Sequence, residues 1–381
     1  MQNNSFCPYP FMQIVVRTTG KINPCCDFVS SPYNINNHTV SEYMQSDFLQ
    51  NIRNQMLNGQ QVPGCEKCTR SEKLMGTSAR IEALRDYKFF SEKHYLKLLD
   101  YYKWQDKKYP SRFEFHTGNL CNLKCLTCRP EDSSAFLSEN KILKISNHSQ
   151  SDYTVSDTHV KKLLSEVTSD NNLDLLDLRG GESMLSPIIK KVLLEYAGSE
   201  KLKETTLRIQ TNGTILDDDW KKILNNFKKV ELMVSIDAYG DDNHYIRYPA
   251  NWNAIENNVF YFKNIPNSKV YIHCTVSNLN LLVLDKLLNW TEQKNIFLHC
   301  APLTNYREFM TTTLPEKLYN QALSRLSDWR LKNESVNSIC NIEYNFDKES
   351  WEKFKKVITL RDNYRQNSIF DILPEFRDHW E

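Results

Sequence analysis

The sequence predicts an α/β protein whose parallel sheet is open or curled into a partial barrel of six β/α repeats. A small metal-cluster module precedes this sheet and a helical extension follows it. Three observations predict this arrangement. Cysteines gather near the start, six strand-like runs alternate with helical ones between residues 111 and 305, and the pattern from 306 to 381 is mostly helical.

Residues 1–75 are rich in Pro, Asn, Ser and Cys and lack sustained hydrophobic periodicity. Such a segment suits a small module held together by metal rather than by apolar burial. Between residues 86 and 109 apolar side chains recur at helical spacing, so we expect residues 76–110 to connect the module to the sheet by a helix. The polar stretch 140–156 is expected to be a loop.

The six strand-like runs define the expected sheet. They are residues 112–116, 173–178, 206–210, 230–236, 270–276 and 296–300. Amphipathic stretches between them can each place one apolar face on a sheet. Because each run is followed by a polar or glycine-rich segment, we expect the candidate functional residues at the carboxyl edge of the sheet, where parallel α/β folds build their sites.

Composition and charge exclude several classes of protein. The 48 basic and 47 acidic side chains give a net charge of +1, so no long-range field would attract nucleic acid or an anionic membrane. No run of about 20 apolar residues and no leader pattern are found. We therefore expect a soluble cytoplasmic protein with neither a membrane nor nucleic acid as its partner.

The 11 cysteines form two spaced sets with four left over. Disulfides are rare in a reducing compartment, where clustered thiolates are typical of zinc or iron-sulfur sites. The first set is Cys7, Cys25, Cys65 and Cys68. The second set is Cys121, Cys125 and Cys128.

The second set has the spacing Cys-x3-Cys-x2-Cys, which differs from the paired Cys-x2-Cys units of a zinc ribbon. Three thiolates on one loop leave a metal site incomplete. One interpretation is a zinc site that takes its fourth ligand elsewhere, such as His116. The other is an iron-sulfur cluster with one iron open to a further ligand.

The segment Cys121-Asn-Leu-Lys-Cys125-Leu-Thr-Cys128 after a strand resembles the signature of the radical S-adenosylmethionine (SAM) superfamily, and the resemblance extends over about residues 111–305. It implies a partial TIM-like barrel in which the three cysteines hold three irons of a 4Fe-4S cluster. SAM would chelate the fourth iron through its amino and carboxylate groups. One-electron reduction would then cleave SAM to a 5′-deoxyadenosyl radical.

The resemblance also implies a set of SAM-contacting residues. They are Thr127, Gly180, Gly181, Glu182, Asn212, Ser235, Asp237 and Arg247. In the family a Gly-Gly-Glu segment accepts hydrogen bonds from the SAM ammonium, as a close backbone and a carboxylate can. Arg247 matches an arginine that reaches the SAM carboxylate, although a surface salt bridge explains it equally well. Asn212 is also a turn signal, and Thr127 replaces an aromatic residue of many relatives.

The first cysteine set resembles the twitch module, a shortened SPASM domain that holds one auxiliary 4Fe-4S cluster. Gly20 precedes Cys25 with the spacing Gly-x4-Cys, and Cys65-x2-Cys68 completes four ligands. The module precedes the barrel here, as in a subgroup with an amino-terminal twitch domain. Cys26 is an alternative ligand to Cys25, and a zinc knuckle is the alternative centre.

The resemblance implies an enzyme that abstracts a hydrogen atom from a peptide or protein side chain, aided in electron transfer by the auxiliary cluster. An electron donor such as flavodoxin or ferredoxin would supply the reducing equivalent. A dehydrogenase or epimerase of a small amino acid or sugar-like metabolite is a second enzymatic interpretation. A non-enzymatic zinc or iron-sulfur scaffold is the third. The sequence assigns no further catalytic residue.

Overall fold

The structure, a computed structural model, describes residues 5–29, 31–86, 108–145, 156–169, 173–196 and 202–380. The chain divides into two compact units, which we describe separately. The first comprises Met1–Asn119, Gln150–Arg208 and Asp219–Lys229. The second comprises Leu120–Ser149, Ile209–Asp218 and Val230–Glu381. The helix expected between residues 86 and 109 and most of the expected loop 140–156 lie outside the described residues.

The first unit begins with seven short elements. They are α1 (Tyr9–Met12), β1 (Gln13–Val16), β2 (Ile22–Asn23), α2 (Val40–Met44), α3 (Asp47–Leu57), α4 (Glu66–Met75) and α5 (Ala79–Asp86). Helix α2 begins with a capping box, in which the Thr39 side chain accepts from the Glu42 backbone and the Glu42 side chain accepts from that of Thr39. Ser46 caps α3 in the same sense.

An apolar core holds this amino-terminal segment. Its buried members are Phe6, Cys7, Phe11, Phe28, Ile52, Met56 and Val62. The prediction that apolar burial plays little part here was therefore wrong. Hydrophobic periodicity does not predict this core, because its side chains come from loops and short helices and follow no single period.

The six expected strands are all present, which confirms the predicted sheet. They are β3 (Arg112–His116), β4 (Leu175–Arg179), β5 (Thr206–Thr211), β6 (Lys229–Ser235), β7 (Ser268–Val276) and β8 (Phe297–Pro302). Two further strands were not predicted, because β1 pairs parallel with β3 and β2 pairs antiparallel with β1.

The strand order is β2-β1-β3-β4-β5-β6-β7-β8, and β5 has residues in both units. Every described pairing except that of β2 is parallel. The sheet is open, since β2 and β8 are its edges. An open parallel sheet with intervening helices agrees with the predicted partial barrel.

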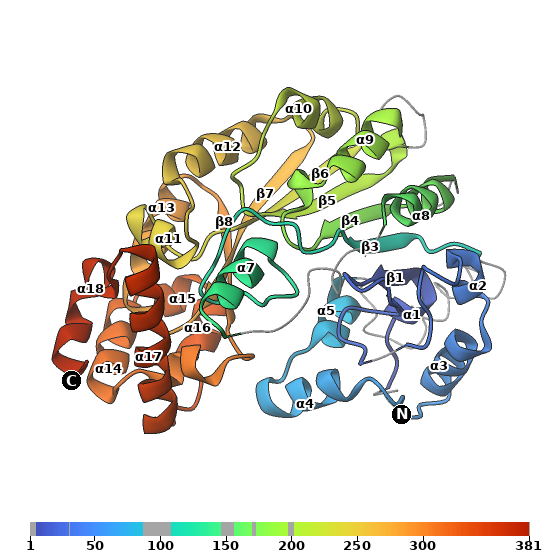
Figure 1. Cartoon of the computed structure of the whole chain (residues 1–381). Coiled ribbons are helices and arrows are strands. Elements are labelled where there is room, and N and C mark those ends of the chain that lie inside the picture. The colour runs from blue at the N-terminus through green and yellow to red at the C-terminus, as the bar shows by residue number, and fades with distance from the viewer. Residues whose placement is uncertain are drawn as a thin grey trace. The chain divides into compact units, whose positions relative to one another are not determined.

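Helices connect the strands in both units. In the first unit these are α8 (Asp157–Ser169), η2 (Ser183–Leu185), α9 (Pro187–Tyr196) and η3 (Leu202–Glu204), with α10 (Asp218–Leu224) after β5. Helices α8 and α9 pack side by side (Figure 1). In the second unit they are α7 (Ser134–Ile142), α11 (Asp241–Ile246), α12 (Trp252–Asn264), η4 (Leu281–Val283) and α13 (Leu284–Gln293).

The carboxyl-terminal extension is helical, as predicted. Its elements are η5 (Arg307–Phe309), η6 (Thr311–Thr313), α14 (Glu316–Arg325), α15 (Trp329–Lys332), α16 (Glu334–Cys340), α17 (Lys348–Arg365), α18 (Ile369–Ile372) and η7 (Pro374–His379). The longest, α17, contacts η5 and η6. None of the helices in the described part of the chain combines the length and apolar character needed to cross a membrane.

Candidate functional site

The second unit holds the Cys-x3-Cys-x2-Cys loop, which follows β3 in the chain and leads into α7. The hydroxyl of Ser133 caps α7 by accepting from the Phe136 backbone at 3.1 Å, and it donates to the Leu123 carbonyl at 2.6 Å. The neighbouring Ser134 hydroxyl accepts from the Cys121 backbone at 3.2 Å. The start of α7 therefore fixes the first half of the cysteine loop.

A short backbone pairing fixes the other half of the loop. The backbone N–H groups of Lys124 and Leu126 donate to the carbonyls of Tyr248 and Ile246 at 2.6 and 2.9 Å. Cys125 lies between the two donors and Arg247 between the two acceptors. The cysteine and the arginine are therefore held opposite each other.

Burial dominates the electrostatics of these thiols. It raises the pKa of Cys125 to about 12, against the opposing effect of Arg247. Burial also raises the pKa of Cys128, and Cys125 and Cys121 raise it further. The three sulfurs thus lie within electrostatic reach of one another. A metal centre binds thiolates, so its binding here must displace protons.

Asn212 lies beside the first cysteine. Its amide donates to the Asn122 side chain at 2.9 Å and approaches the Cys121 sulfur at 3.9 Å. Its oxygen accepts from the backbone of Thr214 at 2.9 Å, so Asn212 also forms the turn that its sequence predicts. Thr127 lies half-buried between Cys125 and Cys128.

Asp237 and Arg247 form a buried ion pair in the second unit. Arg247 Nη1 lies 2.8 Å from Asp237 Oδ2, with side chains 13% and 1% exposed. The other carboxylate oxygen accepts from the Thr275 backbone at 2.8 Å. Arg247 is thus buried rather than part of a surface salt bridge. Its Nε is buried without a hydrogen-bond partner, a donor that an anionic ligand could satisfy. Ser235, which is also buried, is the last residue of β6.

In the first unit, backbone hydrogen bonds join the segments that follow β3 and β4. The Thr117 backbone donates to the Arg179 carbonyl at 2.8 Å, and Gly181 donates to the Gly118 carbonyl at 2.9 Å. Gly180 has φ +122°, and a Cβ there would lie 2.6 Å from the Gly118 oxygen. Only glycine fits this approach. The buried Glu182 carboxylate caps η2 by accepting from the Met184 backbone at 3.1 Å.

The four amino-terminal cysteines Cys7, Cys25, Cys65 and Cys68 line one cavity of about 720 Å³ in the first unit. Cys65 occupies the N-cap position of α4, without a side-chain cap hydrogen bond, and Cys68 lies in the first turn of this helix. Burial raises the pKa of each thiol, to about 11 for Cys65. Arg80 and Glu72 also line this cavity. Their ion pair, in which Arg80 Nη2 lies 2.6 Å from Glu72 Oε2, joins α5 to α4.

Cys26 is absent from the described lining of this cavity. Its carbonyl accepts from the Arg17 guanidinium. Burial raises the pKa of the Cys26 thiol to about 12, and the nearby carboxylates of Glu114 and Asp27 add to the effect. Adjacent residues 25 and 26 therefore face different surroundings.

Both cysteine sets offer thiols as candidate metal ligands. No three His, Cys, Asp or Glu side chains in the described ranges converge closely enough to hold one metal ion. Tetrahedral zinc requires four ligands at about 2.0–2.3 Å from one point. Four thiols line the amino-terminal cavity and three lie on one loop, and thiolates are the ligands of protein iron-sulfur clusters.

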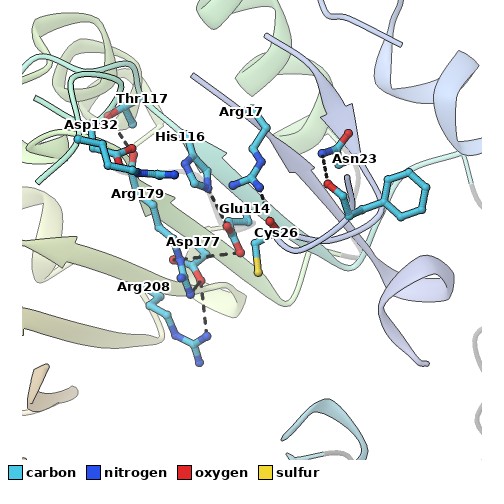
Figure 2. Close-up of polar contacts among 12 residues, drawn as sticks. Arg17, Asn23, Cys26, Glu114, His116, Thr117, Asp132, Asp177, Arg179 and Arg208 are labelled. Atoms are coloured by element: carbon cyan, nitrogen blue, oxygen red, sulfur yellow. Dashed lines mark hydrogen bonds and ion pairs between the residues drawn. The ribbon is translucent and has the colours of Figure 1, made fainter. Parts of the chain in front are cut away.

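Figure 2 shows a charged group on β3, β4 and β5 of the first unit, which the sequence reading did not identify. Its members are Glu114, His116, Asp177, Arg179 and Arg208. His116 Nε2 lies 2.8 Å from Glu114 Oε1, and Arg179 Nη2 lies 3.0 Å from Asp177 Oδ2. Burial opposes ionisation of Glu114, but Arg179 and His116 hold its pKa at about 2.

The sequence pattern that indicates this charged group is the alternation of residue types along the strands. In Arg112-Phe-Glu114-Phe-His116 the charged positions alternate with aromatic ones, so they share one face of the sheet. Register pairing then brings Glu114 beside Asp177, and His116 beside Arg179. A polar ligand over this face would find both donors and acceptors.

Comparison with known proteins gives one family match. Residues 7–69 match the SPASM model, described as an iron-sulfur cluster-binding domain. The matched segment contains all four cysteines of the first set. No curated protein matches the chain.

Several solved structures are similar to the chain. Native anSMEcpe with bound AdoMet and Cp18Cys peptide is 20% identical, with a TM-score of 0.41, over 58% of this chain and 60% of that one. Streptococcus suis SuiB bound to S-adenosylmethionine is 15% identical, with a TM-score of 0.40, over 84% and 69%. The radical S-adenosylmethionine methyltransferase TsrM from Kitasatospora setae is 11% identical, with a TM-score of 0.36, over 49% and 34%.

The chain thus spans about three fifths of the anSMEcpe chain. Its own features are the SPASM match at residues 7–69, the Cys-x3-Cys-x2-Cys loop after β3 and the open parallel sheet. Residues 7–69 of the chain therefore carry a SPASM-type iron-sulfur cluster-binding domain.

Proposed function

We propose that this protein is a radical SAM enzyme that abstracts a hydrogen atom from a peptide or protein side chain. The observation that carries the proposal is the cysteine loop, in which three thiols of one loop lie within electrostatic reach of one another and Cys125 is held opposite the buried Arg247. Three thiolates on a 4Fe-4S cluster leave one iron open for SAM. With both bound, the site supplies a 5′-deoxyadenosyl radical on one-electron reduction.

The chain's own residues would bind and orient these groups. Cys121, Cys125 and Cys128 would each hold one iron. Arg247 has a buried, unpartnered Nε, which supports its assignment to the SAM carboxylate. For the remaining assigned residues, Thr127, Gly180, Gly181, Glu182, Asn212, Ser235 and Asp237, the proposal keeps the SAM contacts that the resemblance implies.

A second cluster would occupy the amino-terminal cavity, held by Cys7, Cys25, Cys65 and Cys68. Its support is the shared cavity and the SPASM match over residues 7–69. Because four thiolates would complete its coordination, this cluster would exchange electrons rather than bind substrate. The different surroundings of Cys26 favour Cys25 as the ligand.

Anaerobic reconstitution followed by dithionite and SAM tests the enzyme proposal. Wild type should release 5′-deoxyadenosine, and Cys125→Ala should release at least about 100-fold less, because the cluster loses a ligand. Cys340→Ala, which removes a buried thiol outside both sets, is the matched control and should keep the activity. Tightly bound zinc and no SAM cleavage in wild type would refute the proposal.

Iron content separates the two clusters. We expect about eight irons per wild-type chain and about four in Cys125→Ala. Cys25→Ala should also fall to about four and keep SAM cleavage, while Cys26→Ala should keep about eight. Loss of iron in Cys26→Ala but not in Cys25→Ala would assign the ligand to Cys26 instead.

A further inference from the structure

Helix α17 of the carboxyl-terminal extension contacts the cysteine loop directly. Its last turns carry Arg361, Asp362 and Arg365, which reach three other segments of the second unit. These are the cysteine loop, helix α7 and the segment that contains Arg247. No motif in residues 306–381 indicates such a role from sequence.

Two arginines of α17 converge on one buried carboxylate of α7. Arg365 Nη2 lies 2.8 Å from Glu139 Oε1 and its Nε lies 3.1 Å from Oε2, while Arg361 donates to Oε1. Arg361 also donates to the Asn140 side chain at 2.6 Å. All three charged side chains are at most 4% exposed. Such a buried, bidentate arrangement fixes α17 and α7 in one geometry.

The same Arg365 guanidinium bonds to the loop itself. Its Nη2 donates to the Lys124 carbonyl at 2.6 Å, next to Cys125. It also lies over the Tyr248 ring, 4.9 Å from the centroid. Since Tyr248 accepts from the Lys124 backbone, one side chain contacts both partners of the pairing that holds Cys125 opposite Arg247.

A third contact joins α17 to the arginine segment. The Tyr245 hydroxyl donates to Asp362 Oδ1 at 2.7 Å, and Tyr245 precedes Arg247 by two residues in the chain. Residues 361, 362 and 365 thus hold both sides of the Cys125 pairing. Fixed side chains of this kind set the orientation of metal ligands in other proteins.

We propose that α17 positions the Cys121–Cys128 loop, with Arg365 and Arg361 as the positioning residues. The carboxyl-terminal extension would then be part of the structure that presents the cluster ligands. The inference that this loop holds a SAM-binding cluster rests on the proposed function. The positioning itself does not, because it concerns hydrogen bonds within the chain.

Hydrogen exchange of the anaerobically isolated protein tests the positioning. In Arg365→Met, amides of residues 121–128 should exchange about tenfold faster or more than in wild type, because the loop loses its anchor. Arg365→Lys keeps the positive charge but loses the planar guanidinium that makes two hydrogen bonds at once. The loop amides of this variant should therefore exchange at an intermediate rate. Lys353→Met, which removes an exposed lysine of the same helix together with its ion pair to Glu308 of η5, should leave loop exchange unchanged.

The spectrum of the cluster provides a second readout. The SAM-induced change in the electron paramagnetic resonance signal should be lost or altered in Arg365→Met, retained in part in Arg365→Lys, and intact in Lys353→Met. Unchanged loop exchange in Arg365→Met, or no protection of the loop in wild type, would overturn the positioning role. If wild type shows a protected loop but no SAM-responsive signal, the proposed function fails while the positioning stands.

Discussion

At the residue scale, close contacts with individual backbone atoms restrict which residue types fit at some positions of the candidate site. Gly180 combines a left-handed backbone with a position where a Cβ would meet the Gly118 carbonyl. The connection between the segments that follow β3 and β4 therefore requires glycine at position 180, whatever contact this segment makes with a ligand. Glu182 likewise has a structural role, because its carboxylate caps η2.

We expect Gly180→Ala to destabilise the protein by about 3 kcal/mol or more, since backbone strain and a backbone clash both oppose the new methyl group. Gly76→Ala is the matched control, because its φ is +69° but nothing lies within 4 Å of the added Cβ. It should cost only about 1–2 kcal/mol of strain. Urea unfolding of both variants measures the difference. Equal losses would show that the Gly118 contact is unimportant.

At the scale of elements, helix starts organise the ligand loops. Cys65 occupies the N-cap position of α4 and Cys68 follows in its first turn, so two cysteines of the first set lie at the start of one helix. Ser133 caps α7 and also bonds to the cysteine loop. The spacing Cys-x3-Cys-x2-Cys predicted a loop of three ligands. It could not predict that a serine five residues later would anchor it, because N-cap serines are common and their second partner is not encoded locally.

Ser133→Ala should lower the free energy of unfolding by about 1 kcal/mol and also loosen the cysteine loop. Ser46→Ala is its control. Ser46 caps α3 by accepting from Leu49 at 3.3 Å and donates to Tyr43 at 2.7 Å, the same pair of bonds in the first unit. Both variants should lose similar stability in urea, but only Ser133→Ala should exchange faster at residues 121–128. Identical exchange there in the two variants would contradict the anchor.

At the scale of the whole molecule, the sequence predicts the repeating parts and misses the non-local ones. The six strands follow from local periodicity, and the open sheet agrees with them. The pairing of β1 with β3 and the buried Glu139–Arg365 contact join residues about 100 to 226 positions apart. No local pattern encodes such contacts, so they required the structure. The two cysteine sets could be listed from the sequence, with Cys26 left as an alternative to Cys25, whereas the charged face of β3 to β5 required the strand register.

The amino-terminal core leads to a prediction about metal removal. Zinc fingers unfold without metal because they have little else to bury. Here Ile52 and Met56 of α3 are 4% and 2% exposed within the apolar core. Arg53 of the same helix is fully buried and donates to the Pro10 and Met44 carbonyls at 2.8 and 3.1 Å. The Arg53 hydrogen bonds tie α3 to α1 and α2 without any cysteine.

We therefore expect Cys65→Ala to lose about four irons while α3 stays folded. Its far-UV circular dichroism should match wild type, and the amides of residues 49–56 should remain protected from exchange. Met56→Ala is the opposite case, because a cavity in the apolar core costs about 2–5 kcal/mol and should expose α3. Exchange of α3 in Cys65→Ala at the rate of an unfolded chain would mean that the cluster, rather than apolar burial, holds this segment together.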